Sequence, residues 1–384
     1  MKRFKQSAAI LLLACVHAAQ AQPSFRGTYP EYATAYQLNP AHTGSIDFAT
    51  GFKPPLKEAW SVDLSATQSA PAIAEDKVFT IGDDGIVTAL DVTNGRKHWS
   101  KGLAKGDLPN LLGPAYDNGQ LFVLNTSLLL TALVARSGKT KWVTQLPNEN
   151  FADAPPMAAD GQVYVGGTGE AGRLYAVDES SGAIRWQNFV ENGDFSSPAY
   201  DGAGIYVAYP CHFYKFERVT GNILWDYKGG VEGGGGESPV VFGNRVYLQD
   251  ITGCGDIIAR AKDGFFLGSF DEGRMNLWGS PTIFANSKAK PVGVSLVDKT
   301  LVGWNGANGA MLWSFSGSGP FSTAPIVVNG TIFAGSDDGK LYAVSEKGRR
   351  VWNTTLAGPV TELAAGQGTL IVIMGSKIAA FVPQ

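Results

Sequence analysis

The sequence is poor in the residues that build metal centres and disulfide frameworks. It holds only four histidines and three cysteines in 384 residues. No two histidines stand four residues apart, so their spacing does not predict a catalytic metal cluster. Only Cys211 and Cys254 remain once the leader described below is removed.

An excess of positive charge is also missing. Charged residues make up 17% of the chain, and the formal net charge is −3. Nucleic-acid binding needs a basic surface, so we exclude it as the function. No apolar run is long enough for a transmembrane helix, since even the longest, from Ala8 to about Val16, is too short.

The first 21 residues have the layout of a secretory signal. Lys2, Arg3 and Lys5 precede the apolar run, and Ala19-Gln20-Ala21 forms a small-residue cleavage site. We therefore expect residues 1–21 to be a signal peptide and the protein to be secreted or periplasmic. In an alternative interpretation, Leu12-Leu13-Ala14-Cys15 resembles a bacterial lipobox, and a lipid on Cys15 anchors the protein to a membrane.

Turn residues and tryptophan are what the chain has in quantity. There are 48 glycines and 20 prolines. Tryptophans recur 39 to 44 residues apart, except for one interval of 88 residues in which Phe270 stands near the expected position. A period of about 40 residues that carries four short strands is the length of one β-propeller blade. The members of this series are Trp60, Trp99, Trp142, Trp186, Trp225, Trp313 and Trp352.

The clearest copy of the repeat spans residues 320–352. Two β-rich runs, APIVV and TIFAG, are separated by Asn329-Gly330, which is a strong signal for a type I′ hairpin. A DDG turn, the run KLYAV, a bend at Gly348 and Trp352 complete the unit. This unit resembles the PQQ-like β-propeller repeat of quinoprotein dehydrogenases, and the resemblance covers about residues 55–384.

The two ends of the chain predict how the ring closes. After Trp352 the last copy has only three strands, whereas the segment around Trp60 looks like a tryptophan strand with no partners of its own. We expect an all-β, eight-bladed propeller of four-stranded antiparallel blades, in which this N-terminal strand completes the last blade. Seven blades is the alternative, if residues 229–313 form one irregular blade.

The domain organisation follows from the repeat. Residues 55–384 form a single propeller domain, and residues 22–54 form an N-terminal arm that lies across one face or the rim. Apolar residues of the inner strands, such as Val78, Phe79 and Val163, are expected to pack between blades. The tryptophans are expected to cap each blade and dock onto the next.

Candidate functional residues lie where the repeat is interrupted. Cys211 and Cys254 fall in matching turns of adjacent blades and predict a disulfide. Side chains expected on the face formed by the second turns and the connections between blades are candidates for a binding surface. They are Glu232, Glu237, Asp250, Asp256, Arg274 and Trp278.

Three functions are consistent with these residues. The first is an exported non-catalytic scaffold that binds a protein or carbohydrate partner as a monomer, similar to the propeller lipoprotein of the outer-membrane barrel-assembly machinery. The second is a quinoprotein oxidoreductase with pyrroloquinoline quinone and calcium, although the chain lacks that family's adjacent cysteines. The third is a polysaccharide lyase with His212, Tyr209 and Arg274 as catalytic candidates. We favour the first, for which no cofactor is expected.

Overall fold

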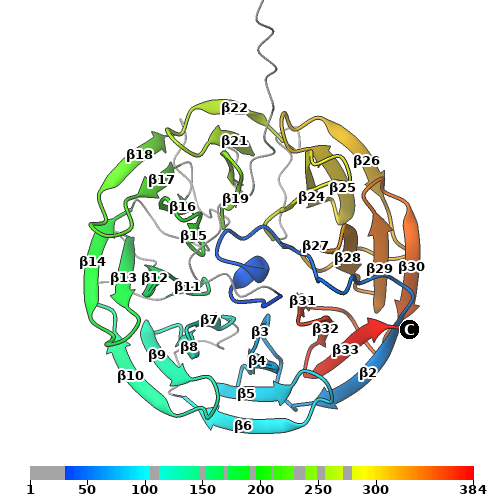
Figure 1. Cartoon of the computed structure of the whole chain (residues 1–384), viewed down its shortest axis with the longest axis horizontal. Helices are drawn as coiled ribbons and strands as arrows, with labels where there is room; N and C mark the ends of the chain where they lie inside the picture. The colour runs from blue at the N-terminus through cyan, green and yellow to red at the C-terminus, as the bar shows by residue number, and fades with distance from the viewer. Residues whose placement is uncertain are drawn as a thin grey trace, which may run out of the picture.

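The computed structural model describes residues 31–103, 112–147, 152–167, 172–190, 196–209, 212–228, 238–248, 256–270 and 279–384. Within these ranges the strands form eight sheets arranged as a ring (Figure 1). Each blade has four antiparallel strands, the first near the axis and the fourth at the rim. The eight-bladed prediction is confirmed. The seven-bladed alternative is wrong, because residues 238–270 and 279–315 each form a complete blade.

The strands of blades one to four follow one another from the axis outwards. They are β3 (Ala72–Ala74), β4 (Lys77–Ile81), β5 (Ile86–Asp91) and β6 (Lys97–Gly102); β7 (Ala115–Asp117), β8 (Gln120–Leu124), β9 (Leu129–Val134) and β10 (Thr140–Gln145); β11 (Met157–Ala159), β12 (Gln162–Gly167), β13 (Arg173–Asp178) and β14 (Ile184–Phe189); and β15 (Ala199–Tyr200), β16 (Ile205–Tyr209), β17 (His212–Phe216) and β18 (Ile223–Lys228).

Blades five to eight repeat the same order. Two short elements lie in the N-terminal arm, ahead of all the blades. The arm holds η1 (Tyr36–Leu38) and β1 (Ser45–Ile46). The blade strands are β19 (Val240–Phe242), β20 (Arg245–Leu248), β21 (Ile257–Arg260) and β22 (Phe266–Ser269); β23 (Thr282–Ala285), β24 (Pro291–Val297), β25 (Thr300–Asn305) and β26 (Met311–Phe315); β27 (Ile326–Val328), β28 (Thr331–Gly335), β29 (Lys340–Ser345) and β30 (Arg350–Thr355); and β31 (Glu362–Gly366), β32 (Thr369–Met374), β33 (Lys377–Pro383) and β2 (Leu56–Asp63).

The ring closes by pairing the two ends of the chain. Strand β2 lies antiparallel to β33, with Trp60 opposite Ala380. Figure 1 shows the two strands side by side, the first blue and the second red. The predicted closure is confirmed. It removes two sheet edges that would otherwise be open to another chain.

Local turn chemistry also agrees with the sequence. Asn329 and Gly330 both have positive φ, 47° and 73°, as a type I′ turn requires. Strands β27 and β28 pair directly on either side of this turn, with Val328 opposite Thr331.

The core consists of the layers between adjacent blades. Val163 and Val165 pack in a cluster with side chains of blade two, whereas Tyr164 between them packs with blade four. All three are fully buried. Alternate residues of one strand therefore face opposite neighbours, which is the expected consequence of the two-residue period of a β-strand.

Six of the recurring tryptophans join their blade to the next, as predicted. In six interfaces the indole Nε1 donates a hydrogen bond of 2.9 to 3.2 Å to a backbone carbonyl in the bend between the third and fourth strands of the following blade. The bend glycine lies against the indole in each, and an added Cβ would come within 2.5 to 2.8 Å of its ring carbons. The six pairs are Trp60 with Gly95, Trp99 with Gly138, Trp142 with Gly182, Trp186 with Gly221, Trp225 with Gly264 and Trp313 with Gly348.

Phe270 does not take the place of the missing tryptophan. The tryptophans pair with the third strand of their own blade just before a register shift, and in blade five that position is Gly268, opposite Ile258. Phe270 instead stacks on Trp304 of the next blade, with ring centroids 4.5 Å apart and an angle of 16°. In the interface between blades five and six, the indole therefore comes from blade six and not from blade five.

Candidate functional site

The N-terminal arm closes the centre of the ring. In the described part of the chain it runs around the axis and pairs with the innermost strand of six blades and with the first hairpin of blade eight (dark blue in Figure 1). The backbone oxygen atoms of the arm accept hydrogen bonds of 2.6 to 2.9 Å from these strands and their hairpins. The acceptor and donor pairs are Glu31 and Gln367, Ala33 and Ile73, Thr34 and Tyr116, Pro40 and Tyr200, Ala41 and Val241, Thr43 and Ile283, and Gly44 and Val327. The inner strand edges thus find partners in the arm.

A side-chain network shapes the arm where it passes from blade to blade. The Asn39 side chain accepts a hydrogen bond from the Thr43 backbone N–H at 3.2 Å and donates to Thr43 Oγ1 at 2.7 Å. His42 and Gly44 have positive φ, 56° and 63°. At Gly44 a Cβ would approach Gln37 Oε1 to 2.3 Å, so only glycine fits this bend.

His42 is held in its neutral form inside the arm. Its ring is fully buried, with Nδ1 3.2 Å from the Pro239 carbonyl oxygen. Burial lowers the pKa of His42 to about 3, although the hydrogen bond to Pro239 opposes the shift. At neutral pH His42 is therefore uncharged, and Nδ1 carries the proton that is donated to Pro239.

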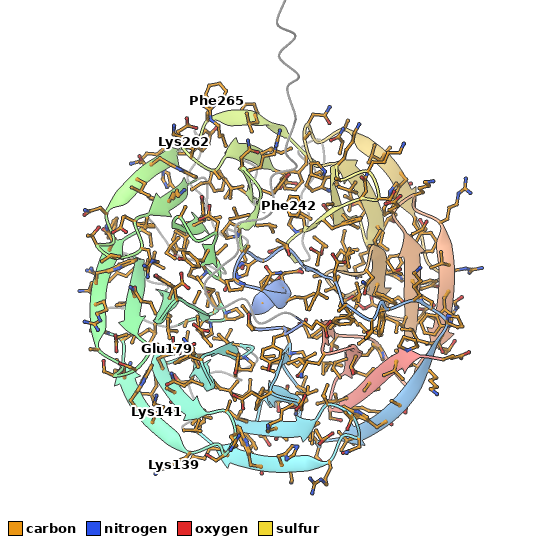
Figure 2. The ribbon with its side chains drawn as sticks, in the orientation of Figure 1. Lys139, Lys141, Glu179, Phe242, Lys262 and Phe265 are labelled. Atoms are coloured by element: carbon orange, nitrogen blue, oxygen red, sulfur yellow. The ribbon has the colours of Figure 1, made fainter. Side chains whose placement is uncertain are left out.

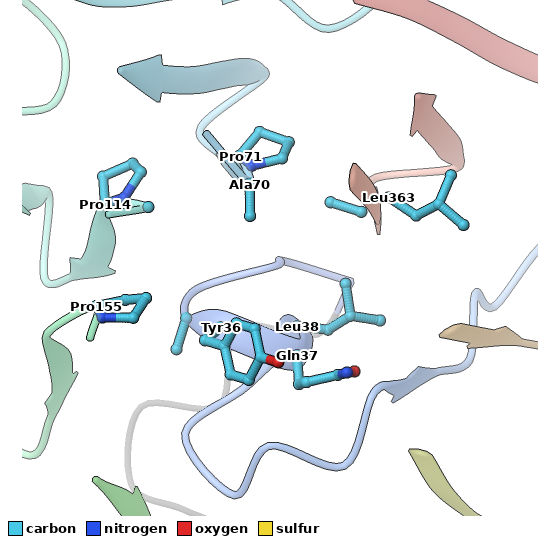
Figure 3. Close-up of a pocket in the computed structure, with 11 residues that line it drawn as sticks. Tyr36, Gln37, Leu38, Ala70, Pro71, Pro114, Pro155 and Leu363 are labelled. Atoms are coloured by element: carbon cyan, nitrogen blue, oxygen red, sulfur yellow. The ribbon is translucent and has the colours of Figure 1, made fainter. Parts of the chain in front are cut away.

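A small pocket lies beside η1 (Figure 3). On one side it is lined by residues 35–38 of the arm, and on the other by residues at or just before inner strands, including Pro71, Pro114 and Pro155. Its empty volume is about 310 Å³, open solvent included. Every lining side chain is apolar except those of Tyr36 and Gln37, and none is charged.

The lining of this pocket does not suit pyrroloquinoline quinone. That cofactor carries several carboxylates, which need cationic or hydrogen-bonding partners when they leave water. None of the lining residues is cationic, and only the side chains of Tyr36 and Gln37 can donate a hydrogen bond. In the ranges that the structure describes, no group of three histidine, cysteine or acidic residues lies close enough to hold a metal ion. The pocket beside η1 is therefore a poor site for this quinone.

Two of the catalytic candidates lie together, but inside a blade. Tyr209 and His212 are directly opposite each other at the end of the β16–β17 hairpin. Tyr209 is fully buried and His212 is 7% exposed. A Cβ on Gly166 of blade three would lie 3.1 Å from the Tyr209 hydroxyl oxygen, which places this hydroxyl in the interface between blades three and four.

The remaining predicted site residues are mostly outside the described ranges. Asp256, immediately before β21, is 1% exposed, and its backbone carbonyl accepts a hydrogen bond from Phe270. The other candidates for the binding face, the candidate disulfide and the candidate anchor lie outside the described residues. They are Glu232, Glu237, Asp250, Arg274, Trp278, Cys211, Cys254 and Cys15.

A buried pair of acids was not predicted. Asp117 of blade two and Glu179 of blade three are 5% and 3% exposed. The Glu179 carboxylate accepts hydrogen bonds from Asn118 at 3.2 Å and Gln120 at 2.9 Å. Burial raises the pKa of both carboxyl groups, and the Asp117 charge raises that of Glu179 further. An acid stands at Glu179 where the first two blades have Val92 and Ala135, and that departure from the repeat could have revealed it.

None of the described helical segments has the length and apolar character needed to cross a membrane.

Comparison with known proteins places this propeller in a family. The family model described as outer membrane protein assembly factor BamB matches residues 54–153, 107–192, 148–268 and 278–384, which include nearly all of the ring. The chain belongs to this family. The predicted PQQ-like propeller relationship is thereby confirmed.

Some relatives of this BamB-family propeller match it over most of the length of both chains. The outer membrane protein assembly factor BamB of Yersinia pestis is 24% identical over 353 residues, which cover 80% of this chain and 84% of the relative. The crystal structure of BamB from Moraxella catarrhalis superposes with a TM-score of 0.68 at 18% identity and covers 86% of this chain and 98% of that one.

Quinoprotein enzymes share the scaffold. A quinohemoprotein alcohol dehydrogenase from Comamonas testosteroni superposes with a TM-score of 0.74 at 14% identity, covering 92% of this chain and 80% of the enzyme. Likeness at this identity shows a common fold, and the fold serves many functions. The residues of the site must therefore decide between scaffold and enzyme.

Proposed function

We propose that this protein is an exported, non-catalytic scaffold that works in outer-membrane protein assembly by binding a protein partner on a propeller face. The observation that carries the proposal is the family match, which covers the propeller nearly end to end. We further propose that residues 1–21 direct export, either with cleavage after Ala21 or with a lipid anchor on Cys15.

The closed centre of the ring supports a role in surface binding. Quinoprotein and lyase chemistry both need a pocket in which polar groups converge on a substrate. Here the arm occupies the axis, and the pocket beside it is lined by apolar side chains such as Pro71 and Pro114. The surfaces that stay available are the two faces and the rim.

The face that carries the connections between blades is our choice for the protein partner. We place Glu232, Glu237, Asp250, Arg274 and Trp278 there as the candidate contact residues; Asp256, which was also a candidate, is only 1% exposed and is left out. A mixture of acids with one guanidinium and one aromatic side chain is typical of the polar rim and anchor residues of protein interfaces. A carbohydrate partner on the same face is the second candidate.

Deletion of the gene in the native bacterium tests the proposal. We expect the amount of folded outer-membrane β-barrel proteins to fall, and the intact chain supplied on a plasmid to restore it. An Arg274→Ala/Trp278→Ala double variant should restore less, while Lys139→Ala, an exposed change in blade two, should restore fully. An unchanged outer-membrane protein profile after deletion would overturn the proposed role.

The enzymatic alternatives have direct assays. A quinoprotein would acquire a bound quinone absorbance when mixed with pyrroloquinoline quinone and calcium, and we expect none above that of a control propeller. A lyase would release unsaturated products from acidic polysaccharides in a reaction lost in Arg274→Ala. Either signal would replace the scaffold proposal with the corresponding enzyme.

A further inference from the structure

The eight outer strands offer an internal comparison, because the same two positions recur in each. The two residues before the tryptophan position include a charged side chain in five blades, at Lys97, Lys141, Arg185, Arg350 and Glu58. In blades four, five and six, none is charged. Those blades have Ile223-Leu224, Phe266-Leu267 and Met311-Leu312 instead.

These apolar side chains are exposed to solvent. Leu224 is 51%, Phe266 48% and Met311 66% exposed. Val219 and Phe265, in the preceding bends, are 59% and 61% exposed. We define the rim patch as Val219, Ile223, Leu224, Phe265, Phe266, Leu267, Met311 and Leu312, which are eight of the twelve large exposed hydrophobic residues in the described ranges. Scattered exposed apolar residues are normal, but a cluster on three consecutive blades indicates an interaction surface.

The three segments of the rim patch are linked by close packing. The Gly264 bend, which precedes Phe265, lies against Trp225, the neighbour of Leu224. The Gly309 bend, which precedes Met311, approaches the Ser269 backbone at the end of β22. Figure 1 shows β18, β22 and β26 in sequence along one arc of the rim. The patch is therefore one continuous convex band.

Positive charge accompanies the rim patch on the side of the bends and first hairpins. Six cations stand there in blades four to six against three acids, although the whole chain has a net charge of −3. The cations are Arg218, Arg245, Arg260, Lys262, Lys288 and Lys290, and the acids are Asp201, Glu217 and Asp263.

The acids on that side already have partners within their own blades. Asp263 pairs with Arg260 at 2.7 Å, and Glu217 accepts a 2.6 Å hydrogen bond from the Thr220 N–H. Asp201 accepts a 2.7 Å bond from Tyr206. Lys262 and Phe265 point outwards together at the top of Figure 2. Because the cations outnumber the acids, the net charge next to the apolar band is positive.

We propose that the rim patch rests on the surface of an anionic phospholipid membrane. Exposed aromatic and aliphatic side chains flanked by Lys and Arg bind bilayer interfaces, through buried apolar area and attraction to acidic headgroups. A convex band fits a flat, deformable surface better than a peptide, which needs a groove. The described pocket lies at the axis, not at the rim.

The course of the arm supports the same orientation. Glu31 pairs with Gln367 in the first hairpin of blade eight, so the described chain begins on the side of the bends. Cys15 precedes Glu31 by 16 residues, a reach of up to roughly 50 Å. This step rests on the proposed lipid anchor, which would hold the bend side towards the membrane and leave the opposite face for the protein partner.

Vesicle sedimentation of the exported chain carrying Cys15→Ala tests the inference without any acyl chain. We expect binding to vesicles of phosphatidylethanolamine and phosphatidylglycerol, and weak binding to neutral phosphatidylcholine vesicles. Phe266→Ser should lower the partition coefficient by about tenfold, because half a phenyl surface no longer enters the interface. Phe189→Ser is the matched control, since Phe189 at the end of β14 is also 48% exposed.

Charge is tested in the same way. Lys262→Gln should weaken binding to the anionic vesicles at low salt, whereas Lys141→Gln, three blades away at the lower left of Figure 2, should not. Far-UV circular dichroism and melting temperature should match those of the parent for all four variants, because each replaced side chain is exposed.

Several results would overturn the inference. Equal vesicle binding by Phe266→Ser and Phe189→Ser would mean that the rim patch does not enter lipid. Concentration-dependent dimerisation that Phe266→Ser abolishes, without vesicle binding, would make the patch a contact between two copies of the chain. The assay contains no assembly partner, so failure of the proposed assembly role leaves its outcome unaffected.

Discussion

Replacing Gly221 with alanine tests the contact between blades three and four. Gly221 has φ of 72°, and its added Cβ would lie 2.5 Å from two ring carbons of Trp186. Gly368 has the same φ but nothing within 4 Å of its Cβ position. The pair therefore separates backbone strain from steric overlap.

The expected magnitudes follow from these two terms. A left-handed conformation costs a non-glycine residue about 1–2 kcal/mol, and both variants carry that cost. Gly221→Ala must also displace the Trp186 indole, at about 1–3 kcal/mol for overpacking. Displacement would also weaken the 2.9 Å bond from Trp186 Nε1 to the Arg218 carbonyl, a further ~1 kcal/mol.

Urea denaturation followed by far-UV circular dichroism measures the difference. We expect a clearly lower transition midpoint for Gly221→Ala than for Gly368→Ala, at an unchanged slope. Equal midpoints for the two variants would show that Trp186 can pack against a residue with a Cβ at position 221. The inter-blade docking described above would then be incorrect.

Three further predictions use other parts of the ring. Trp142→Ala should lower the free energy of unfolding by about 3–5 kcal/mol. Trp352→Ala should lower it less, because β33 and β2 of blade eight are not joined by a bend on which Trp352 could dock. Equal losses in chemical denaturation would contradict this difference. The pKa of Glu179 is raised in the folded state, so the free energy of unfolding should fall as pH rises above the ordinary value of 4.5 towards neutrality. In melting curves recorded from pH 4 to 8, Glu179→Gln should flatten that decline, and an unchanged profile would refute the role of the buried acid. Asn39→Ala should speed amide hydrogen exchange at Val241, whose N–H bonds to the arm, and leave exchange at Ile371 in blade eight unchanged. If Val241 exchanges at the same rate in the variant and the parent, Asn39 does not hold the arm.

Several features of the fold were predictable because they depend on short stretches of chain. The Asn329-Gly330 turn follows from the positive φ that these residues accept. The alternation of Val163, Tyr164 and Val165 follows from the two-residue period of a strand. The missing fourth strand after Trp352 predicted that Leu56–Asp63 would close the ring.

The candidate site was less predictable, because its contacts join residues far apart in the chain. Tyr209 and His212 are neighbours in sequence and in space, yet their burial depends on how blade three packs over them. The pairing of Asp117 with Glu179 requires two blades to meet at one angle. The Asp256 side chain, expected on a binding face, is buried immediately before β21.

By itself the sequence determined the blade unit, the number of units and the strand that joins the ends, since each follows from a repeated local pattern of turns, alternation and tryptophan. Only the tertiary structure decided which side chains meet across blades, how the arm circles the axis, and that Trp304 with Phe270 fills the interface where Gly268 replaces a tryptophan. The physical reason is that local patterns act through backbone conformation within a few residues, whereas packing between blades depends on surfaces that become neighbours only once the ring has closed.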